Sequence, residues 1–148
     1  MPRSALRAAG SSDALALARE ARERGPLVVL AAAALDAERL REEIAWFDPR
    51  LRVHRLPDWE ILPYDQFSPH PDLVSERLAT LWQFANGEFD VGIVPIATAL
   101  QRLPPRSYLA GRTFRLRARD KLDVENLRAQ LVLAGYAHVQ QVMSPGEF

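Results

Sequence analysis

Residues 27–31 read Leu27-Val28-Val29-Leu30-Ala31 and follow the turn signal Gly25-Pro26. A short, continuous apolar run of this kind is typical of a parallel strand covered on both faces. Apolar residues then recur at helical intervals from Ala33 to Phe47, where Asp48-Pro49 ends the pattern. Leu51 to Leu56 alternates less regularly and is expected to form a second strand. Strand, helix and strand joined by short loops favour a right-handed parallel crossover, so the sequence predicts an α/β fold with a parallel sheet.

The flanking segments extend this pattern in both directions. A helix is expected from Ser11, with Ser11, Ser12 or Asp13 as its cap, to Gly25. A second helix is expected from its cap Asp72 to Asn86-Gly87, a third strand over residues 90–95, and a short helix over residues 96–103. The apolar face predicted for the helix after Asp72 consists of Val74, Leu78, Leu81, Trp82 and Ala85.

The pattern of apolar and charged residues changes after Gly111. Residues 113–118 alternate between apolar and basic side chains, which is typical of a strand with one wet face. Asp123 is expected to cap a helix that Gly135 closes, and residues 136–143 are expected to form a further strand before a turn. We therefore predict two domains, residues 1–106 and the start of a small α/β domain at 107–148. The last strand lacks a partner, so the chain is expected to be a piece of a longer protein.

Composition excludes several classes of protein. The 148 residues include no cysteine, so disulfide frameworks, thiolate metal sites and cysteine nucleophiles are excluded. Nineteen basic residues balance nineteen acidic ones, which argues against sequence-independent DNA binding by the whole chain. No apolar run is long enough to span a bilayer and no signal-peptide core is present, so we expect a soluble, cytoplasmic protein without a membrane partner.

The segment Gly10-Ser11-Ser12-Asp13-Ala14 has the outline of a phosphate-binding loop before a helix. A working loop needs a lysine to neutralise the phosphates and a hydroxyl for magnesium. Asp13 stands where the lysine would be, and Ala14 where the hydroxyl would be. We interpret the segment as a degenerate P-loop and predict no cofactor-binding residue in it, with residual nucleotide binding as the alternative.

The proline-rich stretch Pro57 to Asp72 is predicted to be a rigid surface loop. Its carboxylates and histidine fit no known metal-ligand spacing, and alternate residues around prolines cannot line up as a catalytic triad. We therefore assign no catalytic and no metal-binding residue. Its aromatic residues are interpreted as pinning the loop to its own domain, with a stacking platform for bases as the alternative. The side chains considered are Asp58, Glu60, Asp65, Ser68, His70 and Asp72, and the aromatic residues Trp59, Tyr64 and Phe67.

One group of basic residues stands out: Arg112, Arg115, Arg117 and Arg119, followed by Lys121. It is a candidate surface for docking an acidic protein partner, or the wet face of an edge strand protected from aggregation. Direct DNA binding through these arginines is a third hypothesis.

Several stretches of the sequence match one known family in order. The longest is LPDWEILPYDQFSPH at residues 56–70, followed by SERLATL at 75–81, IVP at 93–95 and ALQR at 99–102. AGY at 134–136, QVM at 141–143 and PGEF at 145–148 continue it. These residues resemble the N-terminal region of the bacterial transcription-repair coupling factors.

The resemblance implies a module similar to the helicase-like subunit of the excinuclease: a degenerate (P-loop-type) three-layer α/β domain, followed by a small domain that contacts the damage-recognition subunit of the excinuclease. It implies that the full protein uses ATP and magnesium to translocate on double-stranded DNA, displaces stalled RNA polymerase and recruits excision repair. The motor would lie outside this chain, which leaves a non-catalytic adaptor. The helicase-like excinuclease subunit itself is the rival interpretation, but it needs an intact P-loop and a long aromatic hairpin.

Overall fold

The computed structural model describes residues 10–59, 61, 66, 68–112, 116, 118–119, 121–144 and 146–148. The chain divides into two compact units, Met1–Arg102 and Leu103–Phe148. Each unit has its own secondary structure and is described by itself. The assignment of residues 1–106 and 107–148 to two domains stays a prediction.

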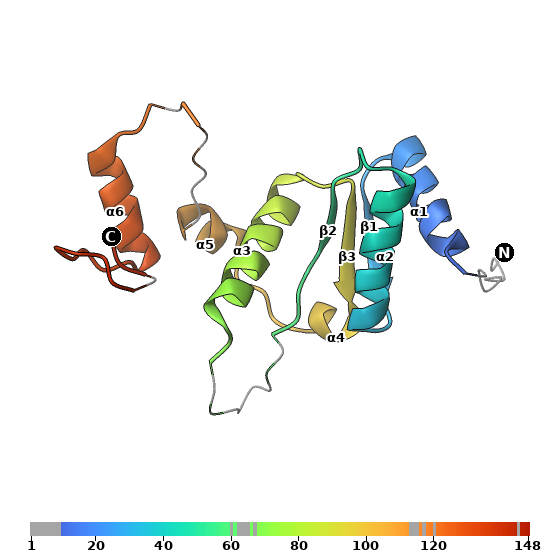
Figure 1. The fold of residues 1–148 in the computed structure, drawn as a ribbon, viewed down its shortest axis with the longest axis horizontal. Helices are drawn as coiled ribbons and strands as arrows, with labels where there is room; N and C mark the ends of the chain where they lie inside the picture. The colour runs from blue at the N-terminus through green and yellow to red at the C-terminus, as the bar shows by residue number, and fades with distance from the viewer. Residues whose placement is uncertain are drawn as a thin grey trace. The chain divides into compact units, whose positions relative to one another are not determined.

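The first unit alternates helices and strands around a parallel sheet (Figure 1). The sheet has the order β1-β3-β2, with Leu27 and Val53 both in register with Val91. The α/β fold with a parallel sheet is therefore confirmed. The elements are α1 (Ser12–Arg24), β1 (Leu27–Ala31), α2 (Ala34–Phe47), β2 (Val53–Arg55), α3 (Pro71–Asn86), β3 (Val91–Pro95) and α4 (Ile96–Ala99).

Local chemistry explains where these helices begin and end. Gly25 ends α1 at φ 92°, and Gly87 ends α3 in the left-handed region at φ 68°, a conformation that glycine adopts without steric cost. The helix α3 begins one residue before the expected cap, because His70 Nδ1 accepts a hydrogen bond from the Asp72 N–H and Pro71 occupies the first turn. The helix α4 ends at Ala99, four residues earlier than Leu103, the predicted end.

Helices cover the two faces of the sheet differently. Val91 and Ile93 of β3 are fully buried in a core with small residues of α1 and α2. The residue between them, Gly92, faces α3: a Cβ there would lie 2.9 Å from the Phe84 ring. Because side chains alternate along a strand, α2 and α3 pack on opposite faces of the sheet, as Figure 1 shows. The alanines of α1 and α2 in this core are Ala14, Ala18, Ala21 and Ala37.

The predicted face of α3 is confirmed in part: Leu81 is buried and Val74, Trp82 and Ala85 are half-buried, but the most buried side of the helix is rotated toward Arg77 and Thr80. Arg77 is only 2% exposed and Thr80 is buried, whereas Leu78, predicted to be in the core, is 37% exposed. A pattern of apolar residues cannot anticipate that an arginine takes an interior position, which requires polar partners from elsewhere in the chain.

The second unit contains α5 (Arg106–Arg112) and α6 (Val124–Ala134). The helix α6 begins as predicted: the Asp123 carboxylate accepts hydrogen bonds from the N–H groups of Glu125 and Asn126 at 3.1 and 3.2 Å. Gly135 ends it at φ 96°. The helix α5 is not among the predicted elements, because Pro104-Pro105 reads as a linker. Prolines are tolerated just before a helix and do not prevent one from starting there.

The strand predicted for residues 136–143 is wrong. Ala137 forms an isolated bridge with Glu147, and its N–H donates to the Gly146 carbonyl at 2.8 Å. The Met143 and Ser144 N–H groups donate instead to the Glu147 side chain at 2.8 and 3.0 Å. Backbone hydrogen bonds thus join Ala137 and Val139 to residues 146–148, and the Glu147 carboxylate accepts N–H groups where the predicted strand would end. The strand predicted over residues 113–118 falls largely outside the described residues.

Candidate functional site

The segment Gly10 to Ala14 leads into α1, and its central carboxylate is held by α2. Arg39 of α2 donates to both oxygens of Asp13, from Nη2 to Oδ2 at 2.8 Å and from Nη1 to Oδ1 at 3.2 Å. Asp13 Oδ1 also accepts the Ala14 N–H at 2.7 Å. The hydrogen bonds from Arg39 hold the pKa of Asp13 below its ordinary value, so this carboxylate is ionised at neutral pH.

The other side chains of this segment do not form a phosphate cradle. Gly10 adopts a positive φ of 58°, and Ser11, at the N-cap of α1, makes no side-chain capping hydrogen bond. Ala14 is fully buried in the core. Arg39 is engaged twice, because its Nη1 also donates to Glu43 at 2.8 Å. The cation beside Asp13 is therefore already paired with two carboxylates, and an incoming phosphate would meet the negative charge of Asp13.

A second arginine forms a buried polar cluster that sequence reasoning missed. Arg77 of α3 donates from Nη2 to Gln101 Oε1 at 2.9 Å and from Nη1 to the Pro57 carbonyl. Gln101 Nε2 in turn donates to Asp58 Oδ1 at 2.7 Å. The guanidinium carbon of Arg77 lies 4.6 Å from the centre of the Trp59 ring, within the range of a cation–π contact. We call Pro57, Asp58, Trp59, Arg77 and Gln101 the Arg77 cluster.

The Arg77 cluster joins three stretches that are distant in sequence. Its members follow β2, lie on α3 and follow α4, and all three stretches belong to the segments that carry the family resemblance. Burial lowers the pKa of Arg77, but an arginine side chain stays charged at any physiological pH. The cluster therefore fixes the start of the proline-rich loop to the helices beside it.

The remaining candidates of the loop are placed as follows. Trp59 contacts Arg77, in agreement with the pinning interpretation, whereas Tyr64 and Phe67 lie outside the described residues. Asp58 belongs to the Arg77 cluster, and His70 lies beside Asp72 at the start of α3. Glu60 and Asp65 also lie outside the described residues. In the described ranges, no group of three or more His, Asp or Glu side chains gathers as metal ligands would.

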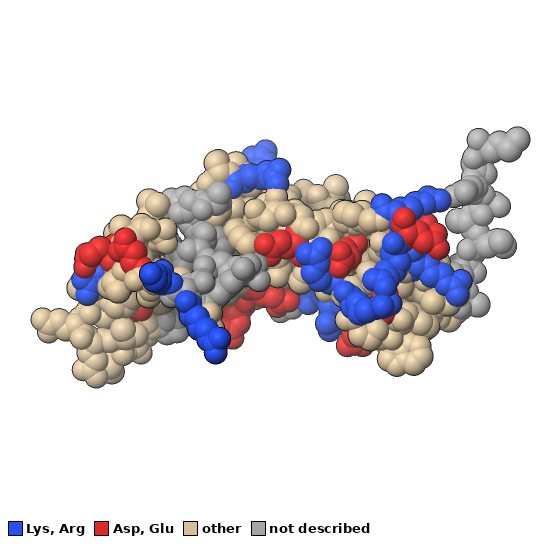
Figure 2. Space-filling view, turned by 90° about the horizontal axis from the view of Figure 1, so that it is seen from above, with Lys and Arg blue, Asp and Glu red and all other residues tan. Residues whose placement is uncertain are grey.

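The basic group after α5 is only partly described. Arg112 ends α5, Arg119 is exposed at a positive φ of 74°, and Arg115 and Arg117 lie outside the described residues. Elsewhere the charges are mixed: on the face shown in Figure 2, Lys and Arg side chains are interleaved with Asp and Glu side chains. Several arginines of the first unit are in ion pairs, such as Arg52 with Asp90 at 2.9 Å. No helix among the described residues is long and apolar enough to cross a membrane.

Comparison with known proteins places this geometry in a family context. The chain is 45% identical over 127 residues to the transcription-repair-coupling factor of Escherichia coli K12, which covers 86% of this chain and 11% of that protein. It is 36% identical over 141 residues to that of Haemophilus influenzae, covering 93% of this chain and 12% of the relative. The chain is homologous to a region of the transcription-repair-coupling factors.

More distant relatives carry the same name. The transcription-repair-coupling factor of Myxococcus xanthus is 29% identical over 134 residues, which covers 84% of this chain and 11% of the relative. No family model matches the chain. The chain thus spans only about 11% of the length of the curated transcription-repair-coupling factors it matches. The resemblance seen in the sequence is confirmed, and the context is that of DNA repair coupled to transcription.

Proposed function

We propose that this chain is a non-catalytic protein-interaction module of a transcription-repair-coupling factor. The observation that carries the proposal is the ion pair between Asp13 and Arg39, at the position where the sequence outline of a P-loop has its lysine. Catalysis of nucleotide hydrolysis needs positive charge directed at the phosphates. Here a carboxylate stands at that place, and Ala14 offers no hydroxyl for magnesium and is buried in the core.

The finer features of the fold are part of this proposal. Residues 1–106 are taken as a degenerate helicase-like domain of the kind found in the helicase-like excinuclease subunit, and residues 107–148 as the start of a second domain. Helices on both faces of a parallel sheet support the first assignment. The helix α6 contacts α5 but holds no buried residue, and Val124, Val132 and Leu133 are each more than half exposed, which supports the second assignment because the apolar side chains of a helix normally pack against a neighbour.

The role of the whole protein is inferred from its relatives. We propose that it is a cytoplasmic, ATP- and magnesium-dependent translocase on double-stranded DNA that displaces stalled RNA polymerase. Its N-terminal region would then bring in the damage-recognition subunit of the excinuclease through the second domain. The arginines at positions 112, 115, 117 and 119 are the proposed contact residues for that partner.

Binding to the immobilised damage-recognition subunit of the excinuclease tests the adaptor role. A chain extended through the complete second domain is expected to be retained, and residues 1–148 alone are expected to bind at least tenfold more weakly. Replacing Arg119, which is exposed, by glutamate in the extended chain is expected to weaken binding further. The matched control replaces Arg19, exposed on α1 of the first unit, by glutamate. Failure of the extended chain to bind would contradict the proposal.

A further inference from the structure

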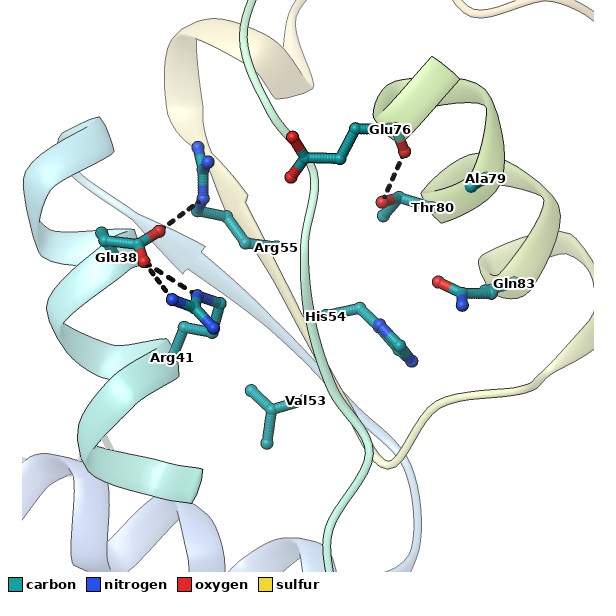
Figure 3. A pocket seen from close by; sticks show the side chains of 9 residues that line it. All are labelled: Glu38, Arg41, Val53, His54, Arg55, Glu76, Ala79, Thr80 and Gln83. Atoms are coloured by element: carbon teal, nitrogen blue, oxygen red, sulfur yellow. Dashed lines mark hydrogen bonds and ion pairs between the residues drawn. The ribbon is translucent and has the colours of Figure 1, made fainter. Parts of the chain in front are cut away.

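A pocket of about 510 Å³ runs along the outer side of β2 (Figure 3). The helix α2 forms one wall and α3 forms the other, because the two helices lie on opposite faces of the sheet and β2 lies between them. We call this pocket the edge slot. Its charged and polar lining consists of Glu38, Arg41 and Arg55 on the α2 side, and His54, Glu76, Thr80 and Gln83 on the α3 side.

The floor of the edge slot is backbone. On its inner side β2 pairs with β3: the Leu56 N–H donates to the Ile93 carbonyl at 2.9 Å, and the Arg52 carbonyl accepts the Val91 N–H at 3.1 Å. Alternate residues of a strand bond to the same neighbour. The backbone N–H and C=O groups of Val53 and Arg55 therefore point away from β3, toward the slot. In the sheet as described, β2 is the end strand.

The two walls differ in charge. On the α2 side, Arg55 Nε lies 2.8 Å from Glu38 Oε2, and Arg41 donates to the same carboxylate. Two guanidinium groups thus share one carboxylate inside the slot, and each has donors to spare. Outside the slot, Glu42 Oε1 lies 3.8 Å from Arg41 Nη2, and the Glu42 side chain is mostly exposed.

The α3 wall contributes no lysine or arginine among the described residues that line the slot. Glu76 extends toward β2, and the Gln83 amide lies beside His54, whose pKa is lowered, first by burial and then by nearby Arg52. A neutral imidazole follows at pH 7. The α3 wall therefore offers a carboxylate and uncharged polar groups.

We propose that the edge slot binds one extended peptide strand of a partner protein by addition to the free edge of β2. Acidic side chains of that strand would face Arg41 and Arg55, and the alternate side chains, polar or basic, would face Glu76 and Gln83. Backbone hydrogen bonds give affinity in this mode, and the walls select alternate side chains. The inference rests on the proposed function, because both assign a protein partner to the module. The edge slot and the experiment that tests it are separate from the site and the test of the proposed function.

The slot itself favours a peptide over a nucleic acid. The two arginines that line the slot are balanced by Glu38 and Glu76, so the slot lacks the uncompensated row of cations on which binding of a phosphate backbone depends. A peptide backbone is uncharged and offers donors and acceptors to the outward backbone groups of Val53 and Arg55, for which the described residues show no backbone partner. The arrangement also keeps the end strand from open association, because helices overhang it on both faces.

The test is an NMR titration of the chain with a synthetic peptide of alternating threonine and glutamate. The amide signals of Val53 and Arg55 are expected to shift with saturable, micromolar to millimolar affinity. A peptide of the same composition with its glutamates adjacent, and one N-methylated at alternate residues, are each expected to bind at least tenfold more weakly. N-methylation removes the donors that pair with β2 and keeps every side chain.

Matched tryptophan variants locate the site. Ala79→Trp places a large ring in the slot from an exposed position of α3, and binding is expected to weaken at least tenfold. Ala16→Trp makes the same change at an exposed position of α1, and binding is expected to be unchanged. Unaltered helix content by circular dichroism shows that both variants fold.

Several outcomes would overturn the proposal. One is the absence of shifts at Val53 and Arg55 at millimolar peptide, and another is equal binding to Ala79→Trp. Concentration-dependent dimerisation abolished by Ala79→Trp would assign the slot to a second copy of the chain. Displacement of the peptide by oligothymidylate would assign it to single-stranded DNA. Binding of magnesium-ATP at Gly10 to Ala14 would overturn the proposed function instead and would leave the shifts at β2 intact.

Discussion

Two arginines of the first unit connect segments that are distant in sequence, each through a different kind of contact. Arg39 joins α2 to the start of α1 through carboxylates, with its side chain 38% exposed. Arg77 joins α3 to the segments after β2 and α4 through a carbonyl, an amide and an aromatic ring, and is 2% exposed. The first contact is electrostatic and in partial contact with water. The second is buried and depends on hydrogen-bond geometry.

The two contacts are therefore expected to differ in how much they stabilise the fold. An exposed ion pair contributes little to stability, about 0.2–1 kcal/mol. At Asp13 the ion pair holds a carboxylate where the sequence outline of a P-loop has its lysine. A buried guanidinium must satisfy its donors or cost several kcal/mol, so the Arg77 cluster is expected to matter mainly for the fold and for the position of the proline-rich loop.

The largest effect is expected for Arg77→Ala. Truncation leaves the Pro57 carbonyl and the Gln101 amide without their donor and leaves a void beside Trp59, and we expect a loss of about 3 kcal/mol in the free energy of unfolding. Urea denaturation followed by tryptophan fluorescence measures it. The matched control, Arg39→Ala, is expected to cost less than about 1 kcal/mol. Equal losses in the two variants would remove the distinction between the sites.

A smaller effect is expected for Gln101→Leu. Gln101 bridges Arg77 and Asp58, so the substitution breaks two hydrogen bonds while keeping most of the volume. The expected loss is about 1–2 kcal/mol, since the guanidinium keeps its bond to Pro57 and its contact with Trp59. In a double-mutant cycle with Arg77→Ala, the two losses should not add. Simple additivity would show that the residues act independently.

The stabilisation that Asp13 provides is expected to depend on pH. Its pKa is lower in the folded chain because of Arg39, so its contribution is complete above about pH 5 and is lost as pH falls below the ordinary carboxyl value of about 3.9. Asp13→Asn is therefore expected to cost less than about 1 kcal/mol at pH 7 and almost nothing near pH 2. Thermal unfolding at both pH values checks this. A difference from the wild type that grows on acidification would contradict it.

The smallest effect is expected for Arg39→Lys. A lysine keeps the charge but lacks the planar fork that gives two parallel hydrogen bonds to Asp13, so the loss is expected to be a few tenths of a kcal/mol and to shrink in high salt. Stability measured at low and at high sodium chloride concentration tests it. An effect that persists unchanged in high salt would show that geometry rather than charge dominates at this site.

The sequence predicted the sheet better than it predicted the polar interior. The strand Leu27–Ala31 and the helix that follows it are set by local apolar patterns and turn residues, and both were found where expected. Arg77, Gln101 and Asp58 meet only because the parallel sheet brings the segments after β2 and β3 to the same end. No local pattern encodes that contact. The strand predicted at residues 136–143 is reduced to a bridge at Ala137, and Glu147 accepts the Met143 and Ser144 N–H groups where that strand would end.

The degenerate P-loop was inferred from residue types at Asp13 and Ala14, without knowledge of any partner. The structure adds Arg39, which lies 26 positions further along the chain and could not be paired with Asp13 from the sequence. The edge slot was also beyond sequence analysis, because its walls come from helices on opposite faces of one short strand.

Calorimetric titration of the chain with magnesium-ATP tests the central claim most directly. Because Asp13 replaces the lysine that the outline of a P-loop requires and Arg39 is already paired, no saturable heat is expected up to millimolar nucleotide. Saturable binding in the micromolar range, lost when Gly10 is replaced by valine, would contradict the account.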